Sequence, residues 1–125
     1  MNVVHAVLLW LGVLAGGGVG AVLRFLVDGA VGRRFPGRLP YGTLVVNLSG
    51  ALVLGVLDGV VLPRDEALLF GTGVIGAYTT FSTWMFETQR LGEERQLARA
   101  IANIWVSMVA GVGLAALGLW WGGTW

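Results

Sequence analysis

The residue types with the greatest capacity for chemistry are concentrated in one stretch, Gly76 to Trp84, which reads GAYTTFSTW. It places hydroxyl side chains and aromatic rings in the middle of an otherwise apolar segment. Hydroxyl groups compete for helix carbonyls, and glycines loosen the backbone around them. We therefore expect a break or kink between Gly76 and Thr80. Carbonyl groups freed at such a break within a membrane are suited to binding a cation.

Two other segments carry polar side chains at helical spacing. Thr43 and Asn47 are four residues apart, as are Asn103 and Ser107. Residues at this spacing lie on one face of a helix, and a polar group in hydrocarbon must find a partner, so both faces should point inward. Such groups either line a path for a solute or only hold neighbouring helices together.

These side chains are neutral and mostly hydrogen-bond donors, which suits a small anion. Phe81 and Trp84 stand three residues apart, and aromatic rings carry a positive edge that attracts an anion without offering a full charge. Conduction requires binding that is strong enough to replace water and weak enough to release the ion. As isolated aromatic residues, however, both rings would more often contact the protein core or lipid. The buried polar groups expected on these faces are Thr43, Asn47, Thr79, Thr80, Ser82, Thr83, Asn103 and Ser107, and Asn47, the hydroxyl groups and Phe81 suit an anion path.

Other kinds of chemistry are poorly served by this sequence. The acidic residues fall at the ends of apolar segments or in turns, which disfavours a proton-coupled transporter. The single histidine, His5, lies at the N-terminus, and no general base accompanies Ser49, Ser82 or Ser107. We expect no catalytic residues. There are no cysteines for thiol or metal chemistry, and no basic run indicates a nucleic-acid partner.

The elements that hold these residues are predicted to be membrane-spanning helices. The chain has 125 residues, of which 56% are hydrophobic and 12% charged, and its mean hydropathy is +0.79. Soluble domains carry about 25% charged residues. A span needs about 20 apolar residues, and we expect an all-α integral membrane protein with a single domain, 1–125, and a broken third helix. The four predicted spans are roughly 3–27, 41–62, 67–87 and 97–121.

Glycine spacing predicts where these helices approach one another. Gly12, Gly16 and Gly20 form one small-residue face, and Gly55 and Gly59 form another. Arg24 lies near the end of the first span, where it either extends to the headgroups as an anchor or stays buried with a partner.

Taken together, three segments resemble the Fluc, or CrcB, family of fluoride channels. They are GGGVGAVLRF, YGTLVVNLSGALVLG and GAYTTFSTWMFE, and the resemblance covers nearly the whole chain. It implies passive export of cytoplasmic fluoride across the plasma membrane. It also implies a dual-topology dimer of antiparallel subunits, two pores at the subunit interface, and a structural sodium ion at the centre.

The resemblance also assigns roles to particular residues. The sodium ligands are the main-chain carbonyls of Gly76 and Thr79, the pore asparagine is Asn47, and the first pore phenylalanine is Phe81. The polar track maps onto Thr43, Ser82, Thr83 and Ser107, and Asn103 stands where a tyrosine is familiar. The chain departs from the family pattern at Trp84, where a second phenylalanine is usual, and at Ala77, where glycine often stands.

The distribution of arginines bears on the dimer. Only Arg64 lies in the second turn, whereas the first and third turns hold Arg33, Arg34, Arg38, Arg90, Arg95 and Arg99. Loops rich in arginine remain in the cytoplasm. Because a homodimer of opposed subunits needs a nearly neutral bias, we hypothesise that this chain pairs with an oppositely oriented homologue. The alternative assembly is a homodimer. The alternatives to the channel function are a non-conducting assembly subunit and, last, a small proton-coupled transporter.

Overall fold

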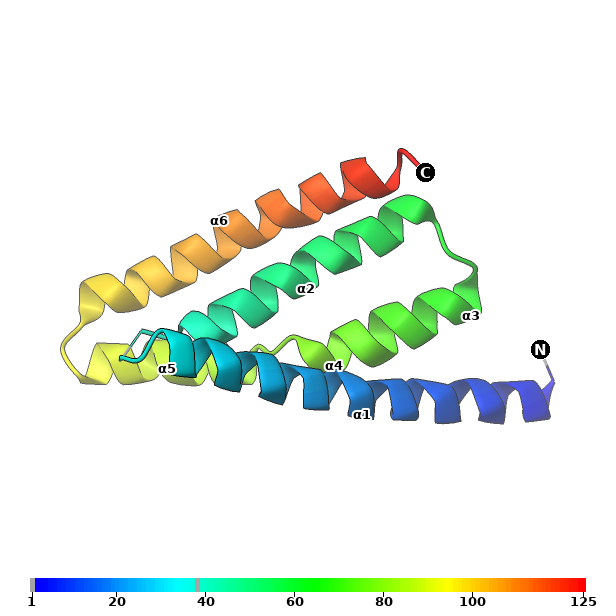
Figure 1. Cartoon of the computed structure of the whole chain (residues 1–125), viewed down its shortest axis with the longest axis horizontal. Helices are drawn as coiled ribbons and strands as arrows, with labels where there is room; N and C mark the ends of the chain where they lie inside the picture. Colours follow the sequence, from blue (N-terminus) through cyan, green and yellow to red (C-terminus); the bar gives the residue numbers. More distant parts are fainter. Residues whose placement is uncertain (1, 38) are drawn as a thin grey trace.

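The structure, a computed structural model, describes residues 2–37 and 39–125 and is helical throughout, with no strand in those ranges (Figure 1). Three of its helices, α1, α2 and α6, are long and apolar enough to cross a membrane. The chain is therefore an all-helical protein with the features of a multi-pass membrane protein. In chain order the elements are α1 Val3–Arg34, α2 Tyr41–Val60, α3 Arg64–Glu66, the π-helix η1 Ala67–Ile75, α4 Gly76–Tyr78, α5 Ser82–Glu93 and α6 Leu97–Gly122.

The helices lie side by side and alternate in direction along the chain. Helix α2 packs against α1 and α6, while η1 and α4 pack on α1, and α5 packs on α6. In Figure 1 both chain termini lie at the end where α2 leads into α3. The opposite end gathers the end of α1, the start of α2 and the turn from α5 to α6. All the described arginines in the first and third turns therefore lie at one end, and Arg64 lies at the other; Arg38 is outside the described residues.

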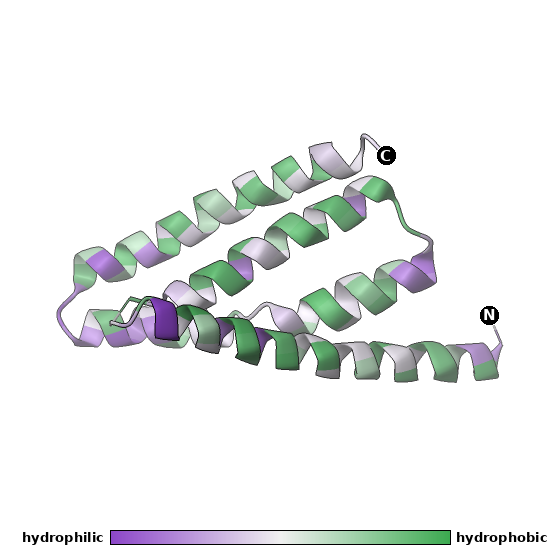
Figure 2. Ribbon diagram, in the orientation of Figure 1, coloured by the Kyte–Doolittle hydropathy of each residue, from purple (hydrophilic) through white to green (hydrophobic). Residues whose placement is uncertain are grey.

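The long helices direct much of their apolar surface outward. Figure 2 shows hydrophobic residues along α1, α2 and α6, with hydrophilic residues gathered towards the turns. Only 6% of the most apolar window of α6 is buried within the chain. Surface of this composition requires lipid or another membrane-spanning subunit around it.

Helix α1 is longer than its predicted span. Residues 28–34, expected to form a turn, continue the helix to Arg34, so that part of the prediction was wrong. The helix ends where Pro36 restricts the preceding residue, and Phe35 has left the helical conformation with φ −126° and ψ 71°. Arg33 and Arg34 occupy the last turn, where positive charge interacts favourably with the helix dipole.

The predicted glycine face of α1 is confirmed as a close-packing surface. A Cβ at Gly12 would lie 2.7 Å from the Leu69 side chain, and one at Gly16 would lie 3.3 Å from the Leu69 carbonyl oxygen. At Gly20 a Cβ would overlap the carbonyl oxygen of Val74. The backbones of α1 and η1 can approach this closely only because side chains are absent from this face.

The pairing of α2 with α6 uses glycines from both helices. A Cβ at Gly55 or Gly59 would overlap a carbonyl oxygen of α6, as the spacing of these two residues predicted. The reciprocal contacts involve Gly118 and Gly122, whose Cβ atoms would overlap carbonyl oxygens of α2. These two α6 glycines were not singled out from the sequence.

The run from α3 to α5 consists of short pieces. The π-helical stretch Ala67–Ile75 leads into one turn of α-helix, after which Thr79 adopts extended dihedral angles of φ −78° and ψ 159°. Regular helix resumes at Ser82. No piece of this run is long enough to cross a membrane alone, because a span needs about 20 residues.

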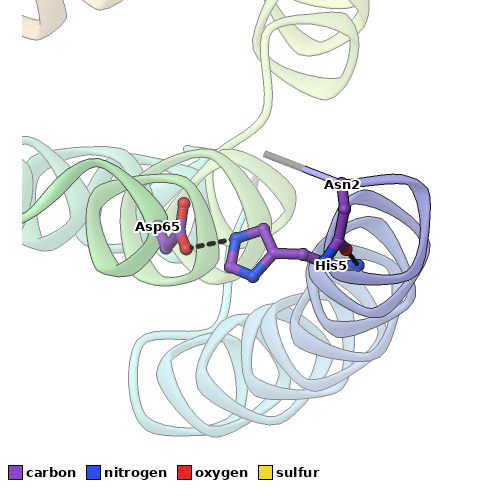
Figure 3. A network of polar contacts seen from close by, with 3 residues as sticks. All are labelled: Asn2, His5 and Asp65. Carbon is purple, nitrogen blue, oxygen red and sulfur yellow. Dashed lines mark hydrogen bonds and ion pairs between the residues drawn. The ribbon is translucent and has the colours of Figure 1, made fainter.

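The start of this run is tied to the first helix by a polar contact. His5 Nε2 lies 2.8 Å from Asp65 Oδ2, and both side chains are more than two-fifths exposed. Asn2 caps α1 by accepting a hydrogen bond from the His5 amide at 2.8 Å (Figure 3). The contact therefore joins α1 to α3 at the surface.

Candidate functional site

The centre of the site is the interruption between α4 and α5, which Asn47 holds from α2. The Asn47 side chain donates from Nδ2 to the Thr80 carbonyl and accepts the Thr80 amide on Oδ1, both at 2.8 Å. In an uninterrupted α-helix the Thr80 amide would instead bond to the carbonyl of Gly76. Asn47 thus replaces the helical partners of Thr80 and fixes the backbone in its non-helical path.

Thr79, the residue that leaves the helix, is fixed by its own backbone and by α2. Its amide and its hydroxyl both donate to the carbonyl of Ile75, at 3.0 and 3.1 Å. Gly50 of α2 lies so close that a Cβ there would overlap the Thr79 methyl group. Within residues 2–37 and 39–125 the Thr79 carbonyl oxygen accepts no hydrogen bond from the chain. Gly76 begins α4, one turn earlier, so the two carbonyls named from the sequence lie within one turn of each other.

The aromatic pair follows immediately after the interruption. The rings of Phe81 and Trp84 meet edge to face, with centroids 5.7 Å apart and planes at 74°. Phe81 is 68% exposed and projects from the chain, whereas Trp84 is half-buried. Both rings line an open cavity of about 340 Å³ together with Asn47 and Thr80. The structure therefore brings the predicted pore asparagine and both predicted rings to one place.

A second cavity lies on the other side of Thr80. It has a volume of about 190 Å³, and its polar lining comprises Arg24, Asp28, Thr43, Thr80 and Thr83. Arg24 is half-buried here, and no carboxylate of the described chain lies within ion-pair distance of it. Arg24 thus lines the same cavity as Thr43 and Thr83 of the predicted polar track.

Glu87 belongs to this group of residues although the sequence reading placed it only at the end of a span. Thr43, which is 3% exposed, donates its hydroxyl to Glu87 Oε1 at 2.8 Å. The other carboxylate oxygen, Oε2, is buried without a hydrogen-bond partner in the described chain. The signal for Glu87 was available, because it stands four residues after Thr83 and so shares its helix face.

Three predicted residues, Ser82, Asn103 and Ser107, line neither of these two cavities. Ser82 is exposed at the start of α5, and neither its side chain nor that of Ser107 makes a hydrogen bond within the described residues. Asn103 bonds to Thr88 through its side chain, at 2.9 Å, and not to Thr43 or Asn47. The thin polar face predicted for the last helix is therefore divided between different environments.

Comparison with known proteins identifies the family of the chain. The family described as "CrcB-like protein, Camphor Resistance (CrcB)" matches residues 11–119. The chain belongs to this family. The match overlaps all four predicted membrane segments and includes every residue that lines the two cavities of the candidate site.

Relatives from several bacteria are similar over nearly their whole length. A Mycobacterium tuberculosis protein named "Fluoride-specific ion channel FluC 2" is 61% identical over 114 residues, covering 91% of this chain and 90% of the relative. One of the same name from Mycolicibacterium paratuberculosis is 64% identical over 112 residues, covering 90% and 92%. "Fluoride-specific ion channel FluC 1" of Streptomyces avermitilis is 46% identical over 116 residues, covering 89% and 93%.

Proposed function

We propose that this chain is a subunit of a fluoride-selective channel through which the anion leaves the cytoplasm passively across the plasma membrane. The relatives named above are fluoride-specific channels. The observation that carries the proposal is the position of Thr80, which lines both the cavity of Arg24 and the cavity of Phe81. In this proposal the hydrogen-bond donors of the first cavity and the aromatic rings of the second form successive parts of one path.

Along this path each group has a distinct part in moving an anion. Arg24 attracts the ion electrostatically into the first cavity. The hydroxyl groups of Thr80 and Thr83 can replace its water, and one amide N–H of Asn47 remains after the bond to Thr80. The ring edges of Phe81 and Trp84 then offer weak positive potential that does not trap the ion. Ser82, Ser107 and Asn103 would have to join the path through a second subunit or a movement of α6.

The run from α3 to α5 would provide a fourth crossing of the membrane. It proceeds in the direction opposite to α2 and α6, between the same two ends of the molecule (Figure 1). Non-helical backbone is tolerated at membrane depth where protein or a water-filled cavity surrounds it. The interruption at Thr79–Phe81 meets this condition because Asn47 and Gly50 pack against it.

The same interruption is suited to a structural sodium ion. We place the ion on the main-chain carbonyls of Gly76 and Thr79. The Thr80 amide bonds to Asn47 in place of Gly76, and within the described residues the Thr79 carbonyl accepts no hydrogen bond. Two carbonyls are too few to surround the ion. Hard cations such as calcium and magnesium take about six oxygen ligands, and we expect a similar need here. A second subunit presenting the same two groups would supply more. Replacing sodium by potassium should therefore destabilise the dimer. The replacement is made at constant ionic strength, so that a general effect of salt is excluded.

The partner subunit is expected to lie antiparallel to this chain. Five described arginines lie at the end where α5 turns into α6 and one at the other end, so insertion should favour the orientation with the arginine-rich end inside. The partner is then either an oppositely oriented homologue, for which this bias argues, or a second copy of this chain. Reporter fusions at the C-terminus test this: both orientations for this chain alone would support the homodimer.

A second candidate function is proton-coupled transport, which the position of Glu87 favours. Its carboxylate is half-buried against Thr43 beside the proposed path, where a group that gains and loses a proton could act on a passing anion. The two functions predict different responses to a pH gradient at zero membrane potential. A gradient should drive net fluoride accumulation only in the coupled transporter.

The decisive experiment is fluoride efflux from liposomes that contain the purified chain, recorded with a fluoride electrode. We expect rapid efflux on addition of a potassium ionophore, and no comparable efflux of chloride. Phe81→Ile should abolish the efflux while the assembly stays intact by size-exclusion chromatography. Absence of efflux from well-folded protein would favour the non-conducting assembly subunit, unless co-expression with an oppositely oriented homologue restored it.

A further inference from the structure

We propose that Thr88 and Asn103 are positioning residues that fix the ring of Trp84 against α6. Three hydrogen bonds carry this assignment. The Trp84 indole Nε1 donates to the Asn103 carbonyl at 3.4 Å, the Asn103 side chain donates to the Thr88 hydroxyl at 2.9 Å, and that hydroxyl donates to the Trp84 carbonyl at 2.8 Å. We call this closed set of bonds the Trp84 clasp.

The clasp ties both ends of one residue to the neighbouring helix. Thr88 lies one turn after Trp84, so its hydroxyl reaches the Trp84 carbonyl within α5. The amide of Asn103 then joins that hydroxyl to α6, and the backbone of the same asparagine receives the indole N–H. The indole bond is the longest of the three and therefore the weakest. The bond from Asn103 to Thr88 is thus the stronger link between α5 and α6, while the bond from Thr88 to the Trp84 carbonyl fixes that hydroxyl within α5.

Asn103 does not share the cavity of the aromatic pair. It lines a separate apolar cavity of about 260 Å³ with Tyr41 and Arg99, and no residue that lines this cavity also lines the one containing Phe81 and Trp84. Within one subunit, Asn103 therefore acts on an ion at Phe81 through the Trp84 ring that it holds. This role differs from the place on the anion path that the sequence predicted for Asn103, which stays a prediction.

Holding Trp84 also holds Phe81. The two rings meet edge to face, and Phe81 is largely exposed, so few other contacts within the chain fix its orientation. If the chain acts as the proposed channel, the clasp therefore sets the orientation of both rings that the anion passes. This step rests on the proposed function. The clasp also directs the indole N–H of Trp84 towards the backbone of α6.

The test uses the full chain labelled with 5-fluorotryptophan, in detergent without added fluoride, and Trp84→Phe assigns the fluorine resonance of Trp84 among the six tryptophans. Thr88→Val keeps the shape of the side chain and removes the hydroxyl that two bonds of the clasp require. We expect the Trp84 resonance to shift or broaden in Thr88→Val and to stay in place in Thr88→Ser. Fluoride efflux should fall by about threefold to tenfold in the valine variant and recover with serine.

A matched control is Thr124→Val. The Thr124 hydroxyl also bonds to a carbonyl of its own helix end, at Trp121, but it is exposed and far from the interruption along the chain. This variant should leave both the Trp84 resonance and the efflux unchanged.

The outcomes separate the clasp from the channel function. An unchanged Trp84 resonance in Thr88→Val would overturn the clasp, whatever happens to efflux. A changed resonance with unaltered efflux would overturn the positioning role in conduction. If the wild-type chain conducts no fluoride even beside an oppositely oriented homologue, the proposed function fails, and the resonance comparison alone then decides whether Thr88 and Asn103 hold the ring.

Discussion

The two halves of α2 are held to their neighbours in different ways. Its second half packs on α6 through Gly55 and Gly59, where backbones meet without side chains between them. Its first half faces the interruption through Thr43 and Asn47, whose side chains form hydrogen bonds with Glu87 and Thr80. One half is held by close packing, the other by directed polar contacts.

This difference indicates which half carries function. Close contact between glycines excludes both water and ions, so the α2–α6 pair is suited to be the rigid support. Burying a polar group in an apolar environment costs desolvation free energy, which is offset only where the group forms its hydrogen bonds. Asn47 satisfies the backbone of Thr80 and still retains a donor, which is what a surface for a passing ion needs.

The largest effect is expected from disturbing the rigid half. In Gly118→Ala the added methyl group would overlap the carbonyl oxygen of Leu52, and a backbone atom cannot move aside as a side chain can. We expect the free energy of unfolding to fall by about 3 kcal/mol, the upper part of the usual range for overpacking. Thermal unfolding in detergent measures this. Gly113→Ala in the same helix is the control, because a Cβ there meets nothing within 4 Å. Equal loss in both variants would contradict the close-packing account.

An intermediate effect on stability, with a complete effect on function, is expected at Asn47. Asn47→Ala removes two hydrogen bonds to Thr80 at once. Interhelical hydrogen bonds in membrane proteins contribute roughly 0.6 kcal/mol each, so the stability loss should be about 1–2 kcal/mol. Fluoride efflux should fall to the level of empty liposomes. Efflux at the wild-type rate from Asn47→Ala would show that the polar half is only structural.

The smallest effect is expected at a polar contact that water can reach. His5 and Asp65 are both well exposed, so His5→Gln should change stability by less than about 0.5 kcal/mol and leave efflux unaltered. Thermal unfolding and the liposome assay measure both. A loss as large as that of Asn47→Ala would mean that burial is not what distinguishes the Asn47 contact.

Much of the fold could be read from local patterns. Apolar length predicted the long helices that the structure contains, and the four-residue spacing of Gly12, Gly16 and Gly20 predicted close packing before the partner was known. The hydroxyl-rich stretch pointed to a change of backbone between Gly76 and Thr80, and in the structure Thr79 is extended. The helical continuation to Arg34 was missed because charge was taken to mark a turn.

The sequence by itself determined the membrane class, the positions of the long helices and which faces must turn inward, because each of these depends on composition and on the 3.6-residue period. Only the tertiary structure decided the partners: Asn47 with the backbone of Thr80, Thr43 with Glu87, and Asn103 with Thr88. The helical period of a sequence shows which face of a helix is buried, but it does not show the axial register at which two helices pack. A shift of one turn between α2 and α5 would give every polar group a different neighbour, since one turn of helix is about 5.4 Å.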